Sequence, residues 1–243
     1  MTEILHISNV TKAFFGFTAL SEVHLRVNQG ERIGLIGPNG SGKTTLINCI
    51  SGVLRANSGE VWFRGGNITK DPTYRRARAG IARTFQIPLP FHSMSVLENL
   101  MVPLDYIVHG MVDATSSSTI HDEAHALLGN VRLGSKANVL AGELSQVELR
   151  KLELARAVAA KPKLLICDEA MAGLAAREVE EILDILLELN AAGITIIMVE
   201  HIMQAVMRFS QRIVCLSAGK VISDGLPSEV MSNPDVRRAY LGN

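Results

Sequence analysis

The sequence predicts an α/β protein with a mainly parallel sheet, an antiparallel β edge and an inserted α-helical subdomain. After residue 145, helical segments alternate with short apolar runs, which is typical of βα units around a parallel sheet. The first 30 residues instead alternate apolar and polar side chains, as strands with one solvated face do. Between these parts, residues 86–141 show helical periodicity.

Length, composition and charge exclude several classes of protein. A chain of 243 residues is too short for two independent enzymes, and its 47% of apolar residues can supply a large core. Lysine and arginine total 24, as do aspartate and glutamate, so no net positive charge favours a nucleic-acid partner. The strongest apolar run, residues 194–199, is too short to cross a bilayer, and the first ten residues lack a secretory signal pattern. We therefore expect a cytoplasmic protein with Cys49, Cys167 and Cys215 as reduced thiols in its core.

The N-terminal part predicts an antiparallel edge followed by a strand, a loop and a helix. Alternating apolar side chains place two strands around residues 4–10 and 23–27. A strand expected to be buried, at residues 32–36, then leads into a glycine-rich turn at residues 37–42 and a helix at residues 43–51. The order of these elements is that of a βα unit with an unusually glycine-rich connection.

A further strand and a basic helix complete this part of the chain. The strand is expected at residues 60–63, and the helix begins near Pro72. We expect its arginines to form a solvated face and not a binding patch. They are Arg75, Arg76 and Arg78.

The inserted helical subdomain begins after these elements. Ser95 and Glu98 form a capping-box pattern ahead of an apolar helical run. Residues 113–119 are polar and non-periodic, which predicts a mobile connection inside the subdomain. We divide the chain, as one domain of residues 1–243, into a core at 1–85 and 161–243 and a helical subdomain at 86–160.

The C-terminal half predicts a series of βα units, a hairpin and two short closing helices that start at Pro227 and Pro234. The two expected strands of the βα units lie at residues 164–167 and 194–199, and the hairpin spans residues 213–223.

A phosphate-binding loop is the most specific signal in the sequence. The pattern GxxxxGK followed by Ser or Thr lies between the predicted strand and helix, which is the context that this motif requires. Its glycines let backbone amides face one anion, the Lys43 ammonium supplies charge for the β and γ phosphates, and the Thr44 hydroxyl is placed for Mg²⁺. The matching residues are Gly37, Pro38, Asn39, Gly40, Ser41, Gly42, Lys43 and Thr44.

Two carboxylates follow the apolar strand at residues 164–167, at the edge where open α/β sheets bind ligands. Asp168 is suited to hold Mg²⁺ through water, and Glu169 to orient or deprotonate a water beside the terminal phosphate. His201 follows the next strand at the same edge, within reach of the γ phosphate, although a lone histidine there is also a common helix cap. Together with the phosphate loop, these residues favour ATP hydrolysis.

Across its whole length, the chain resembles the ATP-binding subunits of ABC transporters, and among them those that power uptake of branched-chain amino acids. The resemblance rests on Gly37 to Thr45 and on five further segments: ARTFQ from Ala82, SVLENL from Ser95, LSQVELRKLELARA from Leu144, CDEAMAGL from Cys167 and EHIMQAVM from Glu200, with AYLG near the end. It implies a P-loop NTPase core of the ABC type that binds ATP with Mg²⁺ through Gly37 to Thr45, including Thr45 itself.

The resemblance also assigns roles outside the phosphate loop. It implies that the Phe14 ring stacks on adenine, with Phe15 and Phe17 as substitutes, whereas an aromatic cluster alone would suggest core packing. It places Gln86 between the core and the helical subdomain, where its amide senses Mg²⁺ and the γ phosphate.

Residues 144–148, which we call the signature segment, depart from the family pattern LSGGQ by losing both glycines. In the family this segment closes over the γ phosphate held by a partner subunit, and Ser145 with its helix N-terminus retains the groups to do so. Val147 adds bulk there and Glu148 adds negative charge, both of which weaken closure. Ser145 and Glu148 also form a capping box, so the segment equally fits a plain helix start.

Two smaller departures concern the segment after Glu169. Ala170 replaces a usual proline, and Ala175 replaces an aspartate found in many members. In the family this segment connects the two ATP sites of a dimer, so the replacements predict weaker communication between them.

The resemblance implies several partners for this chain. They are a second ATP-binding subunit, identical or a sister, that faces it head to tail, transmembrane permease subunits and, indirectly, a solute-binding protein. The implied location is the cytoplasmic face of the inner or plasma membrane, as a peripheral subunit. The alternatives are a non-catalytic ATP-gated subunit, a soluble ABC ATPase and, less compatible with the motifs, a small-molecule kinase.

Overall fold

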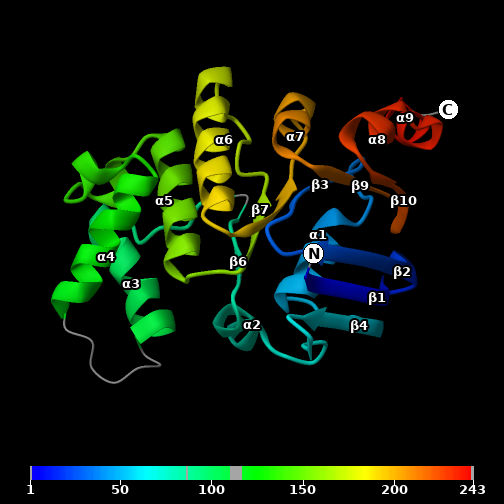
Figure 1. Cartoon of the computed structure of the whole chain (residues 1–243), viewed down its shortest axis with the longest axis horizontal. Helices are drawn as coiled ribbons and strands as arrows, with labels where there is room; N and C mark the ends of the chain where they lie inside the picture. Colours follow the sequence, from blue (N-terminus) through cyan, green and yellow to red (C-terminus); the bar gives the residue numbers. More distant parts are fainter. Residues whose placement is uncertain (1, 86, 110–116, 242–243) are drawn as a thin grey trace.

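The computed structural model describes residues 2–85, 87–109 and 117–241, which form two sheets and the helices around them (Figure 1). The smaller sheet is antiparallel, with strand order β2-β1-β4-β5. Its strands are β1 (Glu3–Phe14), β2 (Phe17–Asn28), β4 (Ser58–Phe63) and β5 (Gly66–Asn67). This is the predicted antiparallel edge, joined by β4, which was predicted as a separate strand, and by β5, a short strand that the sequence pattern did not reveal.

The larger sheet has the order β10-β9-β3-β8-β7-β6 and is parallel except for its edge strand β10. Its strands are β3 (Arg32–Ile36), β6 (Ile81–Arg83), β7 (Leu164–Asp168), β8 (Thr195–Val199), β9 (Arg212–Ser217) and β10 (Lys220–Gly225). Strands β7 and β8 are buried along their whole length, which explains why they read as continuous apolar runs. The predicted α/β fold class is therefore confirmed.

The helices cover both faces of the larger sheet and form a separate group at one end (Figure 1). They are α1 (Lys43–Ser51), α2 (Thr73–Ala79), α3 (Val96–Pro103), α4 (Ser117–Asn130), α5 (Gln146–Ala159), α6 (Ala176–Ala191), α7 (Met203–Phe209), α8 (Pro227–Ser232) and α9 (Pro234–Leu241). A π-helical segment, η1 (Leu104–His109), and two 3-10 turns, η2 (Gly134–Lys136) and η3 (Ala141–Glu143), join them. Alternate residues of β7 serve the two faces, since Leu164 and Ile166 pack in the core with α1, and Leu165 and Cys167 in the core with α6.

Helices α3, α4 and α5 contact one another and lie at the end of the molecule opposite the antiparallel sheet. The predicted capping box starts α3, because the Ser95 Oγ accepts from the Glu98 N–H at 3.2 Å and the Glu98 carboxylate accepts from the Ser95 N–H at 2.7 Å. The apolar residues of these helices continue into the core beside α6. The division into core and subdomain residues remains a prediction.

One expectation for helix α2 was wrong. Arg76 is only 2% exposed, and its guanidinium donates to the carbonyls of Cys49 and Ile50 at the end of α1. It also donates to the Asp71 and Thr69 carbonyls, so a basic residue satisfies backbone oxygens where a solvated face was expected. Its neighbours Arg75 and Arg78 lie nearer the surface.

The predicted connection at residues 113–119 falls partly outside the described residues, which exclude 110–116. Residues 117–119 belong to α4, so that part of the expectation was wrong. No helix in the described part of the chain has the length and apolar character needed to cross a membrane.

The three cysteines are free and buried, as predicted. Burial raises the pKa of Cys49 and of Cys167, and raises the pKa of Cys215 to about 11. A thiol in such surroundings stays protonated and unreactive at neutral pH.

Candidate nucleotide site

The phosphate loop joins β3 to α1 at the carboxyl edge of the larger sheet. Gly37 and Gly42 both adopt left-handed backbone angles, with φ of 147° and 106°. A Cβ on Gly37 would lie 2.1 Å from the Leu216 carbonyl oxygen, so only glycine fits there. The glycines thus bend the chain sharply and bring α1 to its start at Lys43.

Lys43 is folded back onto the loop. Its Nζ donates to the carbonyls of Gly37 at 2.7 Å and Pro38 at 3.1 Å, and the residue is 7% exposed. Burial lowers the pKa of Lys43, and the carboxylates of Glu169 and Asp168 oppose this shift. The ammonium therefore lies beside the loop that it is predicted to serve, with backbone oxygens as its partners.

A cavity of about 330 Å³, which we call the nucleotide cavity, brings most of the predicted site residues together. Both aromatic residues Phe14 and Phe17 line it, whereas Phe15 is fully exposed and is not among the lining residues. The Lys12 ammonium lies 5.0 Å from the centre of the Phe14 ring. The remaining lining residues are Ala19, Asn39, Gly40, Ser41, Gly42, Lys43, Thr44, Thr45, Glu169 and His201.

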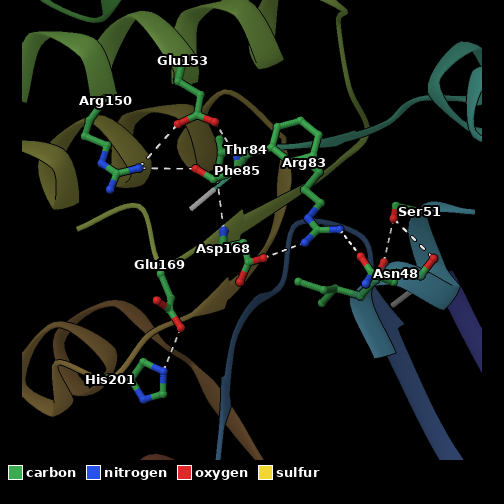
Figure 2. A network of polar contacts seen from close by, with 11 residues as sticks. Asn48, Ser51, Arg83, Thr84, Phe85, Arg150, Glu153, Asp168, Glu169 and His201 are labelled. Atoms are coloured by element: carbon green, nitrogen blue, oxygen red, sulfur yellow. Dashed lines mark hydrogen bonds and ion pairs between the residues drawn. The ribbon is translucent and has the colours of Figure 1, made fainter. Parts of the chain in front are cut away.

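Glu169 and His201 form a contact at this cavity, from the ends of β7 and β8 (Figure 2). The His201 Nε2 and Glu169 Oε1 atoms are 2.9 Å apart. Glu169 has a φ of 49°, and its N–H donates to the Val199 carbonyl at 2.9 Å. Such a left-handed conformation is uncommon outside glycine and clusters at functional sites, which fits a turn that directs the carboxylate into the cavity.

Asp168 lies behind this pair and belongs to a buried polar network. Its Oδ2 accepts from the Arg83 guanidinium at 2.7 Å, and both side chains are about one-tenth exposed, 8% for Asp168 and 11% for Arg83. The Asp168 N–H also donates to the Thr84 Oγ1 at 3.2 Å. Figure 2 shows Arg83 reaching in the other direction to the Asn48 amide oxygen on α1.

Sequence reasoning missed Arg83 and Asn48, although ARTFQ contains the first of them. Arg83 is 85 residues from Asp168 and 35 from Asn48, so no local pattern links the three. An arginine at the end of a short apolar strand, in front of the predicted helical subdomain, was the available signal. Their contact ties the phosphate-loop helix to the carboxylate of β7.

Glu200, which precedes His201, has a structural role. It is 2% exposed, and its carboxylate accepts from the backbone N–H groups of Met171 at 2.9 Å and His201 at 3.3 Å. Burial raises the pKa of Glu200, and these two hydrogen bonds lower it in part. The side chain thereby fixes the segment after Glu169 against the turn that carries His201.

Gln86 lies outside the described residues, and only its surroundings are defined. The preceding residue, Phe85, donates its N–H to Glu153 on α5 and accepts at its carbonyl from Arg150 at 3.3 Å. Burial raises the pKa of Glu153, and the Phe85 hydrogen bond and the charge of Arg150 lower it in part. Helix α5 thus holds the segment that leads to Gln86 by hydrogen bonds from two of its side chains to the backbone of Phe85.

The signature segment lies apart from the nucleotide cavity of its own chain. Ser145 is exposed at the start of α5 and does not line the cavity. The Glu148 carboxylate turns back to accept the Ser145 N–H at 2.9 Å and pairs with the Lys136 ammonium at 2.6 Å. Burial raises the pKa of Glu148, but hydrogen bonds from Lys136 and Ser145 outweigh it and the net shift is downward. The reach-back contact of the predicted capping box is therefore present.

The cavity also offers a polar group without a protein partner. The Ser41 Oγ is buried, and none of the described residues hydrogen-bonds to it. A buried hydroxyl in a loop of positive-φ glycines beside a lysine fits a phosphate oxygen, and the Thr44 hydroxyl with the nearby carboxylates fits Mg²⁺. The donor set is thus suited to a magnesium nucleotide.

Comparisons with known proteins agree with this geometry. The sequence model of the ABC transporter family matches residues 20–172, well over half of the chain. The chain belongs to the ABC transporter family. This ABC protein also matches, over residues 220–243, a model described as a branched-chain amino acid ATP-binding cassette transporter. It is an ATPase subunit of the transporter class, as the resemblance predicted.

Three relatives of this ABC protein are informative. A probable branched-chain amino acid transport ATP-binding protein, LivG of Archaeoglobus fulgidus, is 37% identical, with 99% of this chain and 96% of the relative covered. An ATP-binding cassette of an ABC transporter in its ADP conformation is 34% identical, with a TM-score of 0.89 and 100% of both chains covered. A second cassette, solved as a dimer bound to ADP and phosphate, is 27% identical, with a TM-score of 0.82 over 92% of this chain and 99% of that one.

Proposed function

We propose that this chain binds ATP with Mg²⁺ in the nucleotide cavity and hydrolyses it to power uptake of branched-chain amino acids or related amides. The observation that carries the proposal is the joint placement of the phosphate loop and the Glu169–His201 pair around one cavity. The match at residues 220–243 and the LivG relatives support the choice of solute. Solute passage itself belongs to the permease subunits.

Each residue of the cavity has a defined task in this proposal. The Lys43 ammonium leaves its backbone partners to bind the β and γ phosphates, and the amides of residues 39–45 surround them. Glu169 orients or deprotonates the attacking water, and His201 holds the Glu169 carboxylate and faces the γ phosphate. Phe14 stacks on the adenine, with Phe17 beside it in the same cavity.

Thr44, Asp168 and Gln86 are the residues that would hold Mg²⁺, which neutralises charge on the phosphates when it is bound. For Asp168 this requires the free side of its carboxylate, since Oδ2 is engaged by Arg83. Such an arrangement is compatible with the contact through water that the sequence predicts. The role of Gln86 remains a prediction for a residue outside the described part of the chain.

Two ATP-binding subunits are proposed to face each other head to tail, with ATP between Lys43 of one and Ser145 of the other. The exposed position of Ser145, outside its own chain's cavity, supports a role toward a second subunit. The related cassette that was solved as a dimer bound to ADP and phosphate supports the pairing of two subunits. The second subunit is identical or a sister chain.

The permease subunits are proposed to dock where the core meets the helical subdomain, next to Gln86. A second cavity, of about 360 Å³, opens there between Phe85, Leu89 and Tyr106. Phe85 is 51% exposed, Leu89 71% and Tyr106 75%, and the neighbouring Ile87 is 71% exposed. Together these side chains present an apolar surface to solvent. Docking at this surface would place the chain at the cytoplasmic face of the membrane as a peripheral subunit, with the solute-binding protein as an indirect partner.

The test is phosphate release from ATP and Mg²⁺ by the purified chain over a range of protein concentrations. We expect the specific activity to rise with concentration and Glu169→Gln to lower it by about 100-fold or more, the usual worth of a general base. The matched control is Glu188→Gln, which alters a glutamate that is 60% exposed on α6. If ATP binds but no phosphate appears at any concentration, the chain is a non-catalytic gate or needs a sister subunit.

The solute assignment has its own test in the source cells. Deleting the gene for this chain is expected to abolish accumulation of labelled leucine, isoleucine and valine, and the wild-type chain, but not Glu169→Gln, is expected to restore it. Unchanged accumulation of all three would contradict the proposed solute while leaving the ATPase assignment intact.

A further inference from the structure

The C-terminal helix α9 contacts the phosphate loop directly. The Tyr240 hydroxyl accepts a hydrogen bond from the Gly37 N–H, with 2.7 Å between the two atoms, although the residues are 203 positions apart. Sequence analysis identified Tyr240 only as part of AYLG, a marker of family resemblance. The proposed chemistry of the nucleotide cavity does not use this residue.

Gly37 is held on both sides of its α-carbon. Its N–H donates to Tyr240, and its carbonyl accepts from the Lys43 Nζ at 2.7 Å. Its φ of 147° and the Leu216 carbonyl, which would lie 2.1 Å from a Cβ, leave this residue little room to move. Tyr240 therefore supports the same glycine that receives the lysine of the phosphate loop.

Helix α9 is itself anchored to the core. Val236 is 2% exposed and packs in a cluster with Ile36, the residue before Gly37, and with Cys215 of β9. Partial burial raises the pKa of Tyr240 to about 12, partly offset by the hydrogen bond from Gly37. The hydroxyl is thus neutral at physiological pH and keeps lone pairs to accept the Gly37 N–H.

When phosphate arrives, the Lys43 ammonium has to exchange the Gly37 carbonyl for phosphate oxygens. Tyr240 then provides the one side-chain hydrogen bond to Gly37 that remains among the described residues. A backbone that is held before binding loses less conformational freedom on binding, which favours affinity. If the Tyr240 contact favours the loop conformation that binds nucleotide, bound nucleotide must in turn favour the Tyr240 contact, because the coupling between two sites is reciprocal.

We propose that Tyr240 is a positioning residue that holds the phosphate loop ready for nucleotide, and that nucleotide binding and the packing of α9 are therefore coupled. This inference rests on the proposed function of Gly37 to Thr45 as the nucleotide site. It gives the C-terminal AYLG segment a role in the reaction, distinct from contact with permease subunits.

The experiment compares the full-length wild-type chain with Tyr240→Phe, which removes one oxygen atom and retains the ring. Affinity for ADP with Mg²⁺ is measured by calorimetry, and hydrogen exchange of residues 234–241 is measured with and without ADP. We expect Tyr240→Phe to weaken ADP binding about 3- to 10-fold, the range of one hydrogen bond. We also expect ADP to slow exchange in α9 of the wild type and to have little effect on α9 in the variant.

Controls separate positioning from general stability and from the site assignment. Tyr74→Phe removes a hydroxyl from a tyrosine that is 57% exposed and should bind ADP like the wild type. Tyr240→Phe that binds ADP like the wild type, or that only lowers Tm, would overturn the role of Tyr240. A wild-type chain that binds no ADP, or Lys43→Ala that binds it equally well, would overturn the nucleotide site and this inference with it.

Discussion

The residues around the nucleotide cavity and the signature segment, which the proposed dimer brings together, are held in different ways. At the cavity, the two carboxylates have partners that follow or end other strands: Asp168 contacts the Arg83 guanidinium, 85 positions away, and Glu169 contacts the His201 ring, 32 positions away. The Lys43 ammonium lies on the carbonyls of its own loop. In the signature segment, Glu148 contacts the Ser145 N–H at the start of its own helix and the Lys136 ammonium on the preceding turn, η2, and both partners lie on the surface side of the helical region.

This difference changes how the departure from the family pattern is understood. The sequence predicted that Glu148 would bring negative charge toward a phosphate. In the structure the Lys136 ammonium, 2.6 Å away, balances that charge, and the carboxylate accepts a hydrogen bond from the Ser145 N–H. Glu148 therefore adds little net charge at the start of α5, and its carboxylate is occupied by partners within its own chain.

The largest effect should come from breaking the buried ion pair at the cavity. Arg83→Met leaves Asp168 charged and buried without its cation, which is expected to lower the free energy of unfolding by about 3 kcal/mol. Arg75→Met is the matched control, because that arginine is 63% exposed and lies 3.7 Å from Asp71. The measurement is urea unfolding of both variants, and equal losses would show that burial does not set the worth of these pairs.

A smaller but still large effect is expected on nucleotide affinity. Lys43→Ala removes a charged donor to phosphate and should weaken ATP binding by at least about 30-fold, or about 2 kcal/mol. Lys70→Ala, at an exposed lysine, is the control. Binding is measured by calorimetry with Glu169→Gln in both chains to prevent turnover, and unchanged affinity of Lys43→Ala would remove the phosphate loop from the proposal.

Changes of charge at the signature segment are expected to have a weaker effect, on ATP-dependent dimerisation. Lys136→Glu places a second negative charge beside Glu148, and in a Glu169→Gln background it is expected to weaken ATP-dependent dimerisation by about 5-fold. The double change Lys136→Glu with Glu148→Lys restores the pair and should restore most of the dimer, as measured by analytical ultracentrifugation. A swap that dimerises no better than the single variant would mean that charge balance here does not matter.

The smallest effect is the pH dependence of the Glu148 contribution to stability. Since folding lowers the pKa of Glu148, its stabilising contribution is present above the unfolded pKa and is lost as pH falls through the lower folded pKa. The difference in unfolding free energy between wild type and Glu148→Gln, about 0.5 to 1 kcal/mol at pH 7, should therefore shrink once the pH falls below the usual glutamate pKa of about 4.3 and disappear below the lower folded pKa. A difference that grows on acidification would contradict the direction of the shift.

Features whose positions depend on local pattern were predicted well from sequence. The spacing of apolar residues and glycines at residues 32–51 correctly predicted a strand, a turn and a helix start, because neighbouring residues set the backbone conformation there. The acidic pair and His201 followed from their positions after apolar strands, since parallel strands end at one edge. The structure places Glu169 and His201 at the cavity accordingly.

Contacts between distant segments escaped prediction. Arg76 was expected in solvent but satisfies carbonyls at the end of α1, and Tyr240 joins the C-terminus to Gly37. Lys136 balances Glu148 from a turn in the helical subdomain. In each case a long side chain places its polar group on another element of the fold. Neither hydrophobic periodicity nor charge pattern predicts the partner of that polar group.

The buried cysteines make the chain suitable for site-specific labelling. All three thiols are buried and have raised pKa values, so they should not react with maleimide reagents at neutral pH. A single cysteine introduced on the surface should then be labelled selectively. A spin label or fluorophore at an exposed position such as Asp235 would then report the distance between subunits through an ATPase cycle, with every core residue left in place.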